Sequence, residues 1–333
     1  MGKKYYITGI VFLLLIVFIL SVIFDIAGIG KGNTPIDVKI AEGSGADGVA
    51  ASLKAAGAIN SKIAFKIYSR LTGEHLYQKG THSISTSMSY GEIIDQLEKL
   101  PNVRAKTVLI PEGFEFRQIV KLLEDEGLIN REEFIRAANN EEFDYSFVKG
   151  IPMRENRLEG YLYPDTYVFS EDMTEYDIIN TMLENFEKNV IKVYDAAQTQ
   201  TSLDDIIKLA SVIEREAAND DERKLVSSVF VNRINTGMKL ESCATVQYLL
   251  KERKEILSTE DTQIDSPYNT YKYAGLPVGP IAAPGIKSIE AAIYPEQTNY
   301  LYFMASGDGT YSLFAETYEQ HLENQQKIQG SKE

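Results

Sequence analysis

The pattern of apolar and polar positions begins with a long apolar run. No residue from Tyr5 to Phe24 is charged, and at about 1.5 Å per residue a helix of this length crosses a bilayer core of about 30 Å. Two lysines precede the run and Asp25 follows it, so the positive-inside rule places residues 1–4 in the cytoplasm and the remainder of the chain outside. A cleaved signal peptide is the alternative, but the run exceeds the usual signal core of about 7–15 residues and no A-x-A site follows it. We expect residues 5–28 to form a single-pass membrane anchor.

The next segment contains an internal repeat. Val38 to Asn60 aligns without gaps with Val108 to Asn130. Each copy predicts a short strand, a Glu-Gly turn, an amphipathic helix that ends at glycine and a second helix that begins after asparagine. In the first copy a strand over 79–85 and a helix over 90–100 follow, which gives a βααβ order. The predicted units cover residues 35–102 and 103–150.

Small βααβ units of this kind resemble LysM modules, which bind polymers of N-acetylglucosamine. The resemblance implies a sugar-binding role for the first unit. Strand-turn-helix units are common, however, and the same pattern fits a spacer that holds the next domain away from a membrane. The sequence leaves both interpretations open.

The C-terminal half contains an amphipathic helical pattern from Leu203 to Ala218. Its apolar residues form one stripe at helical spacing. Glu216 projects from the buried side of the helix, Glu214 lies at the other margin of the stripe, and Arg215 points to solvent. Because Glu214 and Glu216 diverge by about 160° around the axis, they cannot form a facing carboxylate pair.

A carboxylate on an apolar stripe is costly unless it is hydrogen-bonded, paired or kept protonated by desolvation. The protonated state is the one that a general acid needs at neutral pH. Glu216 is therefore a candidate catalytic acid. The alternative is a structural glutamate at a helix end, bonded to a loop amide or to Arg223 or Arg233.

The remaining pattern predicts an α+β arrangement. A helix over 221–234 and another that begins near Cys243 lead into a Pro/Gly-rich loop over 266–285, which contains several Tyr, Asn and Thr residues. Such a loop is costly to order unless it contacts something. Tyrosine rings beside amides and hydroxyls suit sugars, and packing of these rings on the protein's own core is the alternative. A helix, a β-hairpin and a terminal helix are then expected over 288–294, 300–314 and 316–328.

Composition narrows the possible functions. The chain has 34 Lys and Arg against 48 Asp and Glu, a net charge of −14, which argues against nucleic acid as a partner. The single cysteine, Cys243, excludes a disulfide framework and a multi-thiolate metal site, and the three histidines lack zinc-binding spacing. We therefore predict no metal and no cofactor. His321, on the terminal helix, is expected to be a surface or packing residue.

Several segments of the C-terminal half, in order, resemble the YceG-like family. They are Glu159–Tyr167, Ala210–Glu216, Ser228–Arg233, Ala244–Tyr248, Tyr268–Tyr271 and Gly275–Pro277. Members of this family are endolytic murein transglycosylases of the bacterial cell membrane, which cleave peptidoglycan glycan strands between MurNAc and GlcNAc. The resemblance implies that Glu216 is the single catalytic residue, that residues 151–330 form the catalytic domain, and that a LysM-like module precedes it. Cell-wall synthases, the penicillin-binding proteins, are the implied protein partners.

The sequence departs from the family pattern at two places. Ala217 stands where many members have Thr after the catalytic Glu, which removes a hydroxyl next to the site. Cys243-Ala244 stands where many members have Asp-Pro, which puts in doubt the need for an acid at that position. Neither change alters Glu216.

The resemblance also implies a mechanism. A lysozyme-type hydrolase uses two carboxylates, whereas in a lytic transglycosylase the C6 hydroxyl of MurNAc is an internal nucleophile and its orientation replaces the second group. Glu216 would protonate the glycosidic oxygen and then accept the hydroxyl proton, which leaves 1,6-anhydroMurNAc ends on nascent strands near the membrane. The predicted sugar contacts are Tyr268, Asn269 and Tyr271.

An acidic exterior gives no attraction to anionic wall polymers. Recognition is therefore expected to rest on sugar rings, hydroxyls and amides rather than on charge. Two other functions remain open: a membrane-tethered, non-catalytic peptidoglycan-binding scaffold, and a lysozyme-type hydrolase. The hydrolase needs a second acid, for which the sequence offers Asp165, Asp220 and Glu241.

Overall fold

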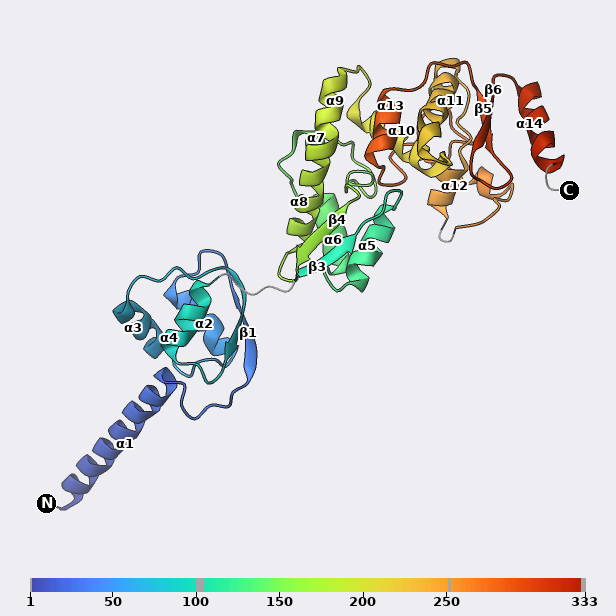
Figure 1. Cartoon of the computed structure of the whole chain (residues 1–333). Helices are drawn as coiled ribbons and strands as arrows, with labels where there is room; N and C mark the ends of the chain where they lie inside the picture. The colour runs from blue at the N-terminus through green and yellow to red at the C-terminus, as the bar shows by residue number, and fades with distance from the viewer. Residues whose placement is uncertain (1, 100–104, 251–252, 331–333) are drawn as a thin grey trace. The chain divides into compact units, whose positions relative to one another are not determined.

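The computed structural model describes residues 2–99, 105–250 and 253–330, and the chain divides into two compact units (Figure 1). The first unit comprises residues 1–106 together with 170–172, and the second comprises residues 107–169 and 173–333. Each contains helices and short two-stranded sheets. The fold is therefore mixed α+β, as the sequence predicts.

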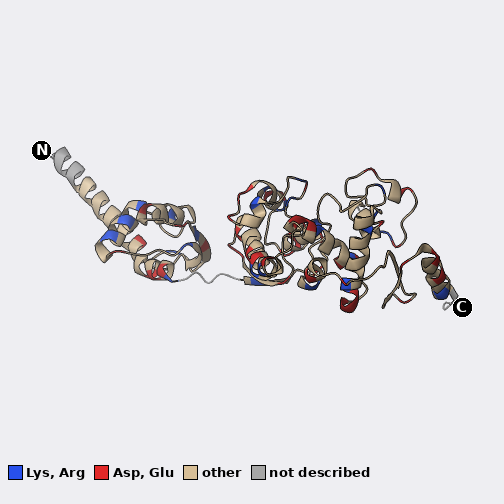
Figure 2. Cartoon of the chain, turned by 90° about the horizontal axis from the view of Figure 1, so that it is seen from above, with Lys and Arg blue, Asp and Glu red and all other residues tan. Residues whose placement is uncertain are grey.

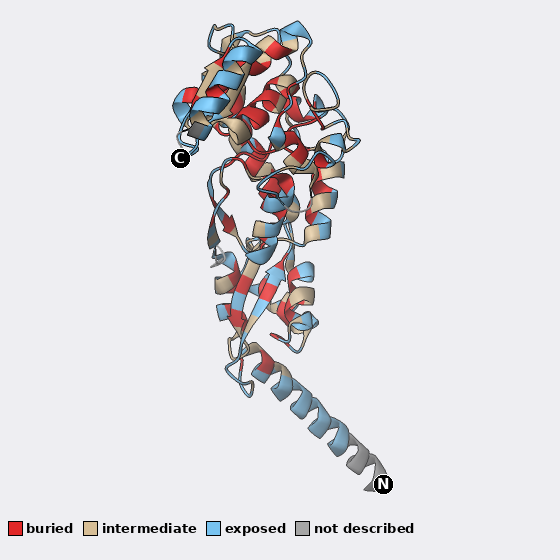
Figure 3. Cartoon of the chain, turned by 90° about the vertical axis from the view of Figure 1, so that its right-hand side faces the viewer, coloured by how far each residue is buried: buried red, intermediate tan, exposed pale blue. Residues whose placement is uncertain are grey.

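Helix α1, Gly2–Ile26, contains the predicted apolar run. Its segment Gly9–Ile26 has a mean hydropathy of 3.0 and is long and apolar enough to cross a membrane. Side chains along this segment are exposed until the last turn (Figure 3), and Figure 2 shows the same stretch free of charged residues up to Asp25. The structure thus contains one N-terminal helix compatible with an anchor.

The last turn of α1 is fastened to the rest of the first unit through Asp25, which is 3% exposed. Its carboxylate accepts hydrogen bonds from the Lys31 ammonium at 2.6 Å, from the backbone N–H groups of Asn60 and Ser61 at 2.9 Å, and from the Tyr90 hydroxyl at 2.5 Å. Four donors on one buried carboxylate stabilise its charge and fix its position. The end of the predicted anchor therefore belongs to the packing of the first unit.

The first unit has the predicted βααβ order, followed by a helix. Strand β1 pairs antiparallel with β2, with Pro35 opposite Ser85 and Ile40 opposite Gly80. Ser61 and Ser89 accept hydrogen bonds from the first turns of α3 and α4 and so fix where these helices begin. The elements are β1 Pro35–Ile40, α2 Ala46–Ala55, α3 Lys62–Thr72, β2 Gly80–Ser85 and α4 Tyr90–Glu98.

The second copy of the repeat has the same order, but it is interrupted by an insertion. Strand β3 pairs with β4, and between the paired helices and β4 the chain inserts α7 and an irregular segment that includes Glu159. The elements are β3 Ala105–Leu109, α5 Phe116–Asp125, α6 Arg131–Asn140, α7 Ser146–Lys149, β4 Thr166–Ser170 and α8 Glu175–Phe186.

The likeness between the copies resumes after the insertion. Ser85 to Ile94 and Ser170 to Ile179 share the pattern S-x-x-M-[ST]-x-x-[ED]-I-I. In both copies the residue after Met is the N-cap of a helix and forms a capping box with the acid three positions later. The second copy is therefore a complete βααβα unit rather than the strand-helix-helix fragment over 103–150 that the sequence predicts.

The rest of the second unit is built around α10, which packs against α11, α12 and α13 (Figure 1). Strands β5 and β6 form the predicted hairpin, with Tyr302 opposite Ala315, and α14 packs on it. The elements are a π-helical turn Glu187–Ile191, α9 Lys192–Ala197, α10 Leu203–Glu216, α11 Arg223–Thr236, α12 Cys243–Leu249, α13 Ile286–Ile293, β5 Tyr302–Ala305, β6 Ser312–Ala315 and α14 Tyr318–Gly330. Short 3₁₀ turns lie at Asp220–Glu222 and Asp261–Gln263.

One hydrophobic core extends through the second unit, from Val108 to Ala292. It contains side chains of the second repeat copy and of the C-terminal elements together. The boundary predicted at residue 150 therefore does not separate two cores.

Candidate active site

Glu216 is the last residue of α10, and its carboxylate lies against the beginning of α12. One oxygen, Oε1, accepts hydrogen bonds from the Ser242 hydroxyl at 2.6 Å and from the Ala244 backbone N–H at 3.1 Å. The other oxygen, Oε2, accepts no hydrogen bond from any residue that the structure describes. The carboxyl group is thus fixed in position by one oxygen and has the other available for a substrate.

The surroundings of Glu216 raise its pKa. Burial is the main cause, and it is opposed by the hydrogen bonds from Ser242 and Ala244 and by the positive charges of Arg215 and Arg253. Ser242 occupies the N-cap position of α12 but makes no capping bond with its side chain. Its hydroxyl is instead directed to Glu216, where it helps to stabilise the ionised form.

The open side of Glu216 faces a cavity of about 320 Å³, the Glu216 pocket. Its walls combine polar groups with the aromatic and apolar side chains of the β5–β6 hairpin. The lining residues are Glu216, Phe230, Arg233, Leu240, Glu241, Ser242, Cys243, Tyr271, Phe303, Met304, Ala305 and His321.

Arg233 and His321 come to this pocket from α11 and α14. The Arg233 guanidinium donates to the backbone carbonyls of Leu301 at 2.6 Å and Leu240 at 2.9 Å, so it ties the hairpin to the segment before α12. His321 stacks on Tyr302 with ring centroids 5.5 Å apart, and burial together with the charge of Arg233 lowers its pKa. The stacking on Tyr302 agrees with the predicted surface or packing role of His321. The place of His321 in the pocket could not be predicted, because the sequence of α14 does not indicate that this helix packs on the hairpin.

Glu214, two residues before Glu216, has a different environment. It accepts hydrogen bonds from the Gly285 backbone N–H at 3.0 Å and the Ser288 hydroxyl at 2.8 Å, and it pairs with Arg223 at 3.1 Å. The Glu214 side chain is 6% exposed. Glu214 therefore holds the start of α13 against α10, and the predicted divergence of the two acids is confirmed by the different segments that they bind.

The three tyrosine-loop residues predicted as sugar contacts are not brought to one place. Tyr271 lines the Glu216 pocket, with its hydroxyl 3.1 Å from the Cys243 sulfur. Asn269 is fully buried, and its amide donates to the carbonyls of Thr262 and Ile264. This differs from an exposed sugar contact: in this geometry Asn269 holds the loop, and its Oδ1 accepts a bond from the Tyr271 backbone N–H.

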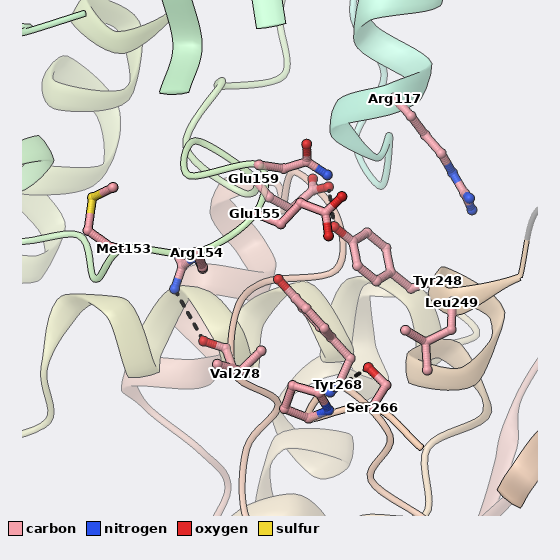
Figure 4. Close-up of a pocket in the computed structure, with 12 residues that line it drawn as sticks. Arg117, Met153, Arg154, Glu155, Glu159, Tyr248, Leu249, Ser266, Tyr268 and Val278 are labelled. Carbon is pink, nitrogen blue, oxygen red and sulfur yellow. Dashed lines mark hydrogen bonds between the residues drawn. The ribbon is translucent and has the colours of Figure 1, made fainter. Parts of the chain in front are cut away.

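Tyr268 instead lines a larger cavity of about 590 Å³ (Figure 4), beside Tyr248, Arg154 and Glu159. Glu159 is 1% exposed, and both its oxygens accept the Phe116 N–H while Oε2 also accepts the Tyr248 hydroxyl at 3.0 Å. Burial raises the pKa of Glu159 to about 8, against the hydrogen bonds from Phe116 and Tyr248, which lower it. In the sequence, Glu159 stands out only as the first residue of the motif Glu159–Tyr167.

Of the three possible second acids, one lies in the Glu216 pocket. Glu241 lines it and pairs with Arg233 at 3.5 Å. Asp220 pairs with Arg223 and Lys287, and Asp165 accepts from Asn185. A two-carboxylate arrangement at this pocket therefore requires Glu241.

Replacing Ser242 by Ala is expected to shift the pH dependence of turnover. The change removes a donor that stabilises the Glu216 carboxylate, so the pKa of Glu216 rises further and the protonated acid persists to higher pH. The alkaline limb of the kcat profile should move to higher pH, whereas Ser242→Thr, which keeps the hydroxyl, should leave the limb near its wild-type position. Equal losses of kcat at every pH in Ser242→Ala would contradict this role.

Comparisons with known proteins agree on one family. The sequence model of the YceG-like family matches residues 38–327. The endolytic murein transglycosylase of Bacillus subtilis (strain 168) is 32% identical over 313 residues, which cover 90% of this chain and 86% of that protein. The enzyme of the same name from Streptococcus pneumoniae serotype 2 is 28% identical over 87% of this chain, which spans 57% of its length. The crystal structure of a yceG-like protein from Listeria monocytogenes matches with a TM-score of 0.60 and 31% identity, over 88% of this chain and 99% of that one.

Proposed function

The chain belongs to the YceG-like family, and we infer from this membership and from the Glu216 pocket that it is an endolytic peptidoglycan lytic transglycosylase. One observation carries the assignment of Glu216. Its carboxyl group lines a cavity and has a raised pKa, one oxygen accepts hydrogen bonds from Ser242 and Ala244, and the other accepts none from a residue that the structure describes. This is the arrangement that a general acid requires.

In the proposed reaction, protonated Glu216 donates its proton to the glycosidic oxygen between MurNAc and GlcNAc as the bond from that oxygen to C1 breaks. The carboxylate then accepts the proton of the MurNAc C6 hydroxyl while this oxygen bonds to C1. The product ends in 1,6-anhydroMurNAc, and Glu216 is protonated again. Water takes no part, and intramolecular attack supplies the rate advantage that orientation confers.

The hydrogen bonds to Oε1 assist the middle of this cycle. Ser242 and Ala244 donate to the carboxylate that exists between the two proton transfers, so they stabilise it where charge develops. Proline, the residue of many family members at this position, has no N–H to donate. Ala244 therefore gives this chain a hydrogen bond that those members cannot form there.

Substrate positioning is proposed to use Tyr271, which shares the pocket with Glu216. The N-terminal helix is proposed to anchor the protein in the bacterial cell membrane with its C-terminal part outside, which would direct cleavage to nascent strands. The βααβ unit is proposed as a LysM-like glycan-binding module, and cell-wall synthases are proposed as partners on the strength of the family resemblance.

The test is an analysis of product ends. The full-length protein in detergent is incubated with purified glycan strands, and mass spectrometry should find 1,6-anhydroMurNAc ends in place of reducing ends. Reducing MurNAc ends would contradict the proposal and indicate a hydrolase. Binding of the strands without any new ends would indicate a non-catalytic scaffold.

The presence of Glu241 in the Glu216 pocket favours hydrolysis as the second candidate. A hydrolase that used Glu241 as base or nucleophile would lose its turnover in Glu241→Gln. A lytic transglycosylase should retain anhydro-end formation in this variant. The analysis of product ends for Glu241→Gln therefore separates the two mechanisms, although wild type degrades the substrate in either case.

A further inference from the structure

A third cavity, the cationic pocket, lies beside the Glu216 pocket in the second unit. It has a volume of about 380 Å³, and α5, α6, α10, α12 and Arg253 contribute to it. Its cationic side chains are Arg117, Lys121, Arg131, Arg215 and Arg253, and Glu115 is the one acid among its lining residues. In a chain of net charge −14, this is a local reversal of sign.

Three of these cations have carboxylate partners. Lys121 pairs with Asp125 at 2.8 Å, Arg131 pairs with Glu124 at 2.8 Å, and Arg117 pairs with Glu115. These ion pairs neutralise three of the five cations. The other two are Arg215 and Arg253.

Arg215 and Arg253 form no ion pair within the described ranges. The one hydrogen bond of Arg215 is to the Gly113 carbonyl, at 3.0 Å. Burial and the neighbouring charge of Arg253 lower the pKa of Arg215, against the opposite effect of the Glu115, Glu214 and Glu216 carboxylates. Glu115 and Glu216 act on both arginines from a distance, without an ion pair to either. Two neighbouring arginines without a paired carboxylate at a cavity are suited to an anion, because a guanidinium binds a carboxylate through two parallel hydrogen bonds. This differs from the sequence prediction, in which Arg215 points to solvent and charge plays no part in recognition.

The cationic pocket is connected to the catalytic group. Arg215 immediately precedes Glu216, and both Arg215 and Arg253 act electrostatically on the Glu216 carboxylate. Helix α12 borders both cavities, since Cys243 lines the Glu216 pocket and Gln247 lines the cationic pocket. An anion bound by the two arginines therefore lies one helix away from the bond that is cut.

The substrate of the proposed reaction carries anions. The lactyl group of MurNAc, the sugar whose glycosidic bond is cut, bears a peptide with free carboxylates, and the cationic pocket is the cavity that shares α10 and α12 with the Glu216 pocket. We propose that the cationic pocket binds the peptide of the glycan strand, and that Arg215 and Arg253 contact its carboxylates. This inference rests on the proposed transglycosylase function.

The experiment compares the full-length protein on two substrates that differ only in the peptide: uncrosslinked glycan strands with their peptides, and the same strands after an amidase has removed them. Wild-type kcat/KM should be about tenfold higher for the peptide-bearing strands, the size of effect that one charge-assisted hydrogen bond supplies. In Arg253→Gln this ratio should fall towards one. Because both substrates are cut by the same Glu216, any change in its pKa cancels in the ratio.

Arg253 is exposed and has no hydrogen bond to another described residue, so its replacement should leave folding intact. Arg136→Gln is the matched control, because it removes one arginine charge from the exposed surface of α6 outside the pocket and should keep the wild-type ratio. Arg215→Gln gives a second measurement, with a thermal melt to establish that the variant is folded.

The outcomes are separable. If wild type forms anhydro ends equally fast on both substrates, or if the ratio survives in Arg253→Gln and Arg215→Gln, the peptide subsite is wrong and the proposed function stands. If neither substrate gains anhydro ends, the proposed function fails and the subsite with it. A third substrate, lipid-linked strands without peptides, identifies the other anion source: selective slowing of Arg253→Gln on these strands would assign the pocket to the lipid diphosphate and overturn the peptide proposal.

Discussion

Replacing Glu216 by Gln should reduce the formation of anhydro ends by at least about a thousandfold. Proton transfer by a positioned side chain contributes about 10²–10⁴-fold to a rate, and in the proposed mechanism one carboxyl group would act first as acid and then as base. The amide has no proton to give to a leaving oxygen at neutral pH. Single-turnover assays on purified strands, with anhydro ends counted by mass spectrometry, measure the loss.

This variant should remain folded. A Gln carbonyl can accept the same bonds from Ser242 and Ala244 that Oε1 accepts, and the neutral amide resembles the protonated acid that burial favours. A melting temperature near that of wild type is the control. Undiminished cleavage by folded Glu216→Gln would remove the catalytic assignment.

Replacing Glu214 by Ala should lower the free energy of unfolding of the second unit by about 3 kcal/mol. Breaking a buried ion pair by removing one partner costs about 3–5 kcal/mol, and here the Gly285 N–H and the Ser288 hydroxyl also lose their acceptor. The lower end of that range applies because Arg223 keeps its pair with Asp220 at 3.0 Å. For a unit of this size we expect a decrease in melting temperature of roughly 6–12 °C.

Glu214→Gln provides the comparison, since the amide oxygen can still accept bonds and only the charge is lost. It should destabilise the protein less than Glu214→Ala. Both variants should form anhydro ends below their melting temperatures, in contrast to Glu216→Gln. If Glu214→Ala has the melting temperature of wild type, the ion pair with Arg223 contributes no stability. If the variant is folded but inactive, Glu214 takes part in the chemistry.

The contrast between these neighbouring acids could be predicted from the sequence because it depends on local geometry. The helical period alone places Glu216 on the buried side of α10 and turns Glu214 away from it. The period also predicts the helices and the hairpin, since each is defined by contacts between residues close in sequence.

The walls of the Glu216 pocket could not be predicted in the same way. Ser242, Phe303 and His321 line this pocket from three segments other than α10, and the periodicity of α10 does not indicate which segments pack there. For Arg215 the helical period gives a direction but not what lies in that direction, which is the Gly113 carbonyl and Arg253. Residue type alone suggests Asn269 as a sugar contact, whereas its burial depends on how the whole loop closes.

The second repeat copy shows a related limit. Its first half aligns without a gap, but the insertion that contains Glu159 displaces the second half. A comparison at one fixed offset therefore ends at the insertion, although Met173 and the capping box of α8 continue the pattern. Ser170 to Ile179 matches Ser85 to Ile94 only at a different offset from that of the first half.

The hydrogen bonds to Asp25 affect how the first unit is oriented relative to a membrane. A transmembrane helix that is longer than the hydrocarbon thickness of its bilayer can be accommodated by tilting. With the last turn of α1 held by four donors from Lys31, Asn60, Ser61 and Tyr90, the first unit would turn through the same angle as the helix. In a bilayer, the helix and the first unit would tilt together, so membrane thickness would change the direction in which the β1–β2 sheet faces.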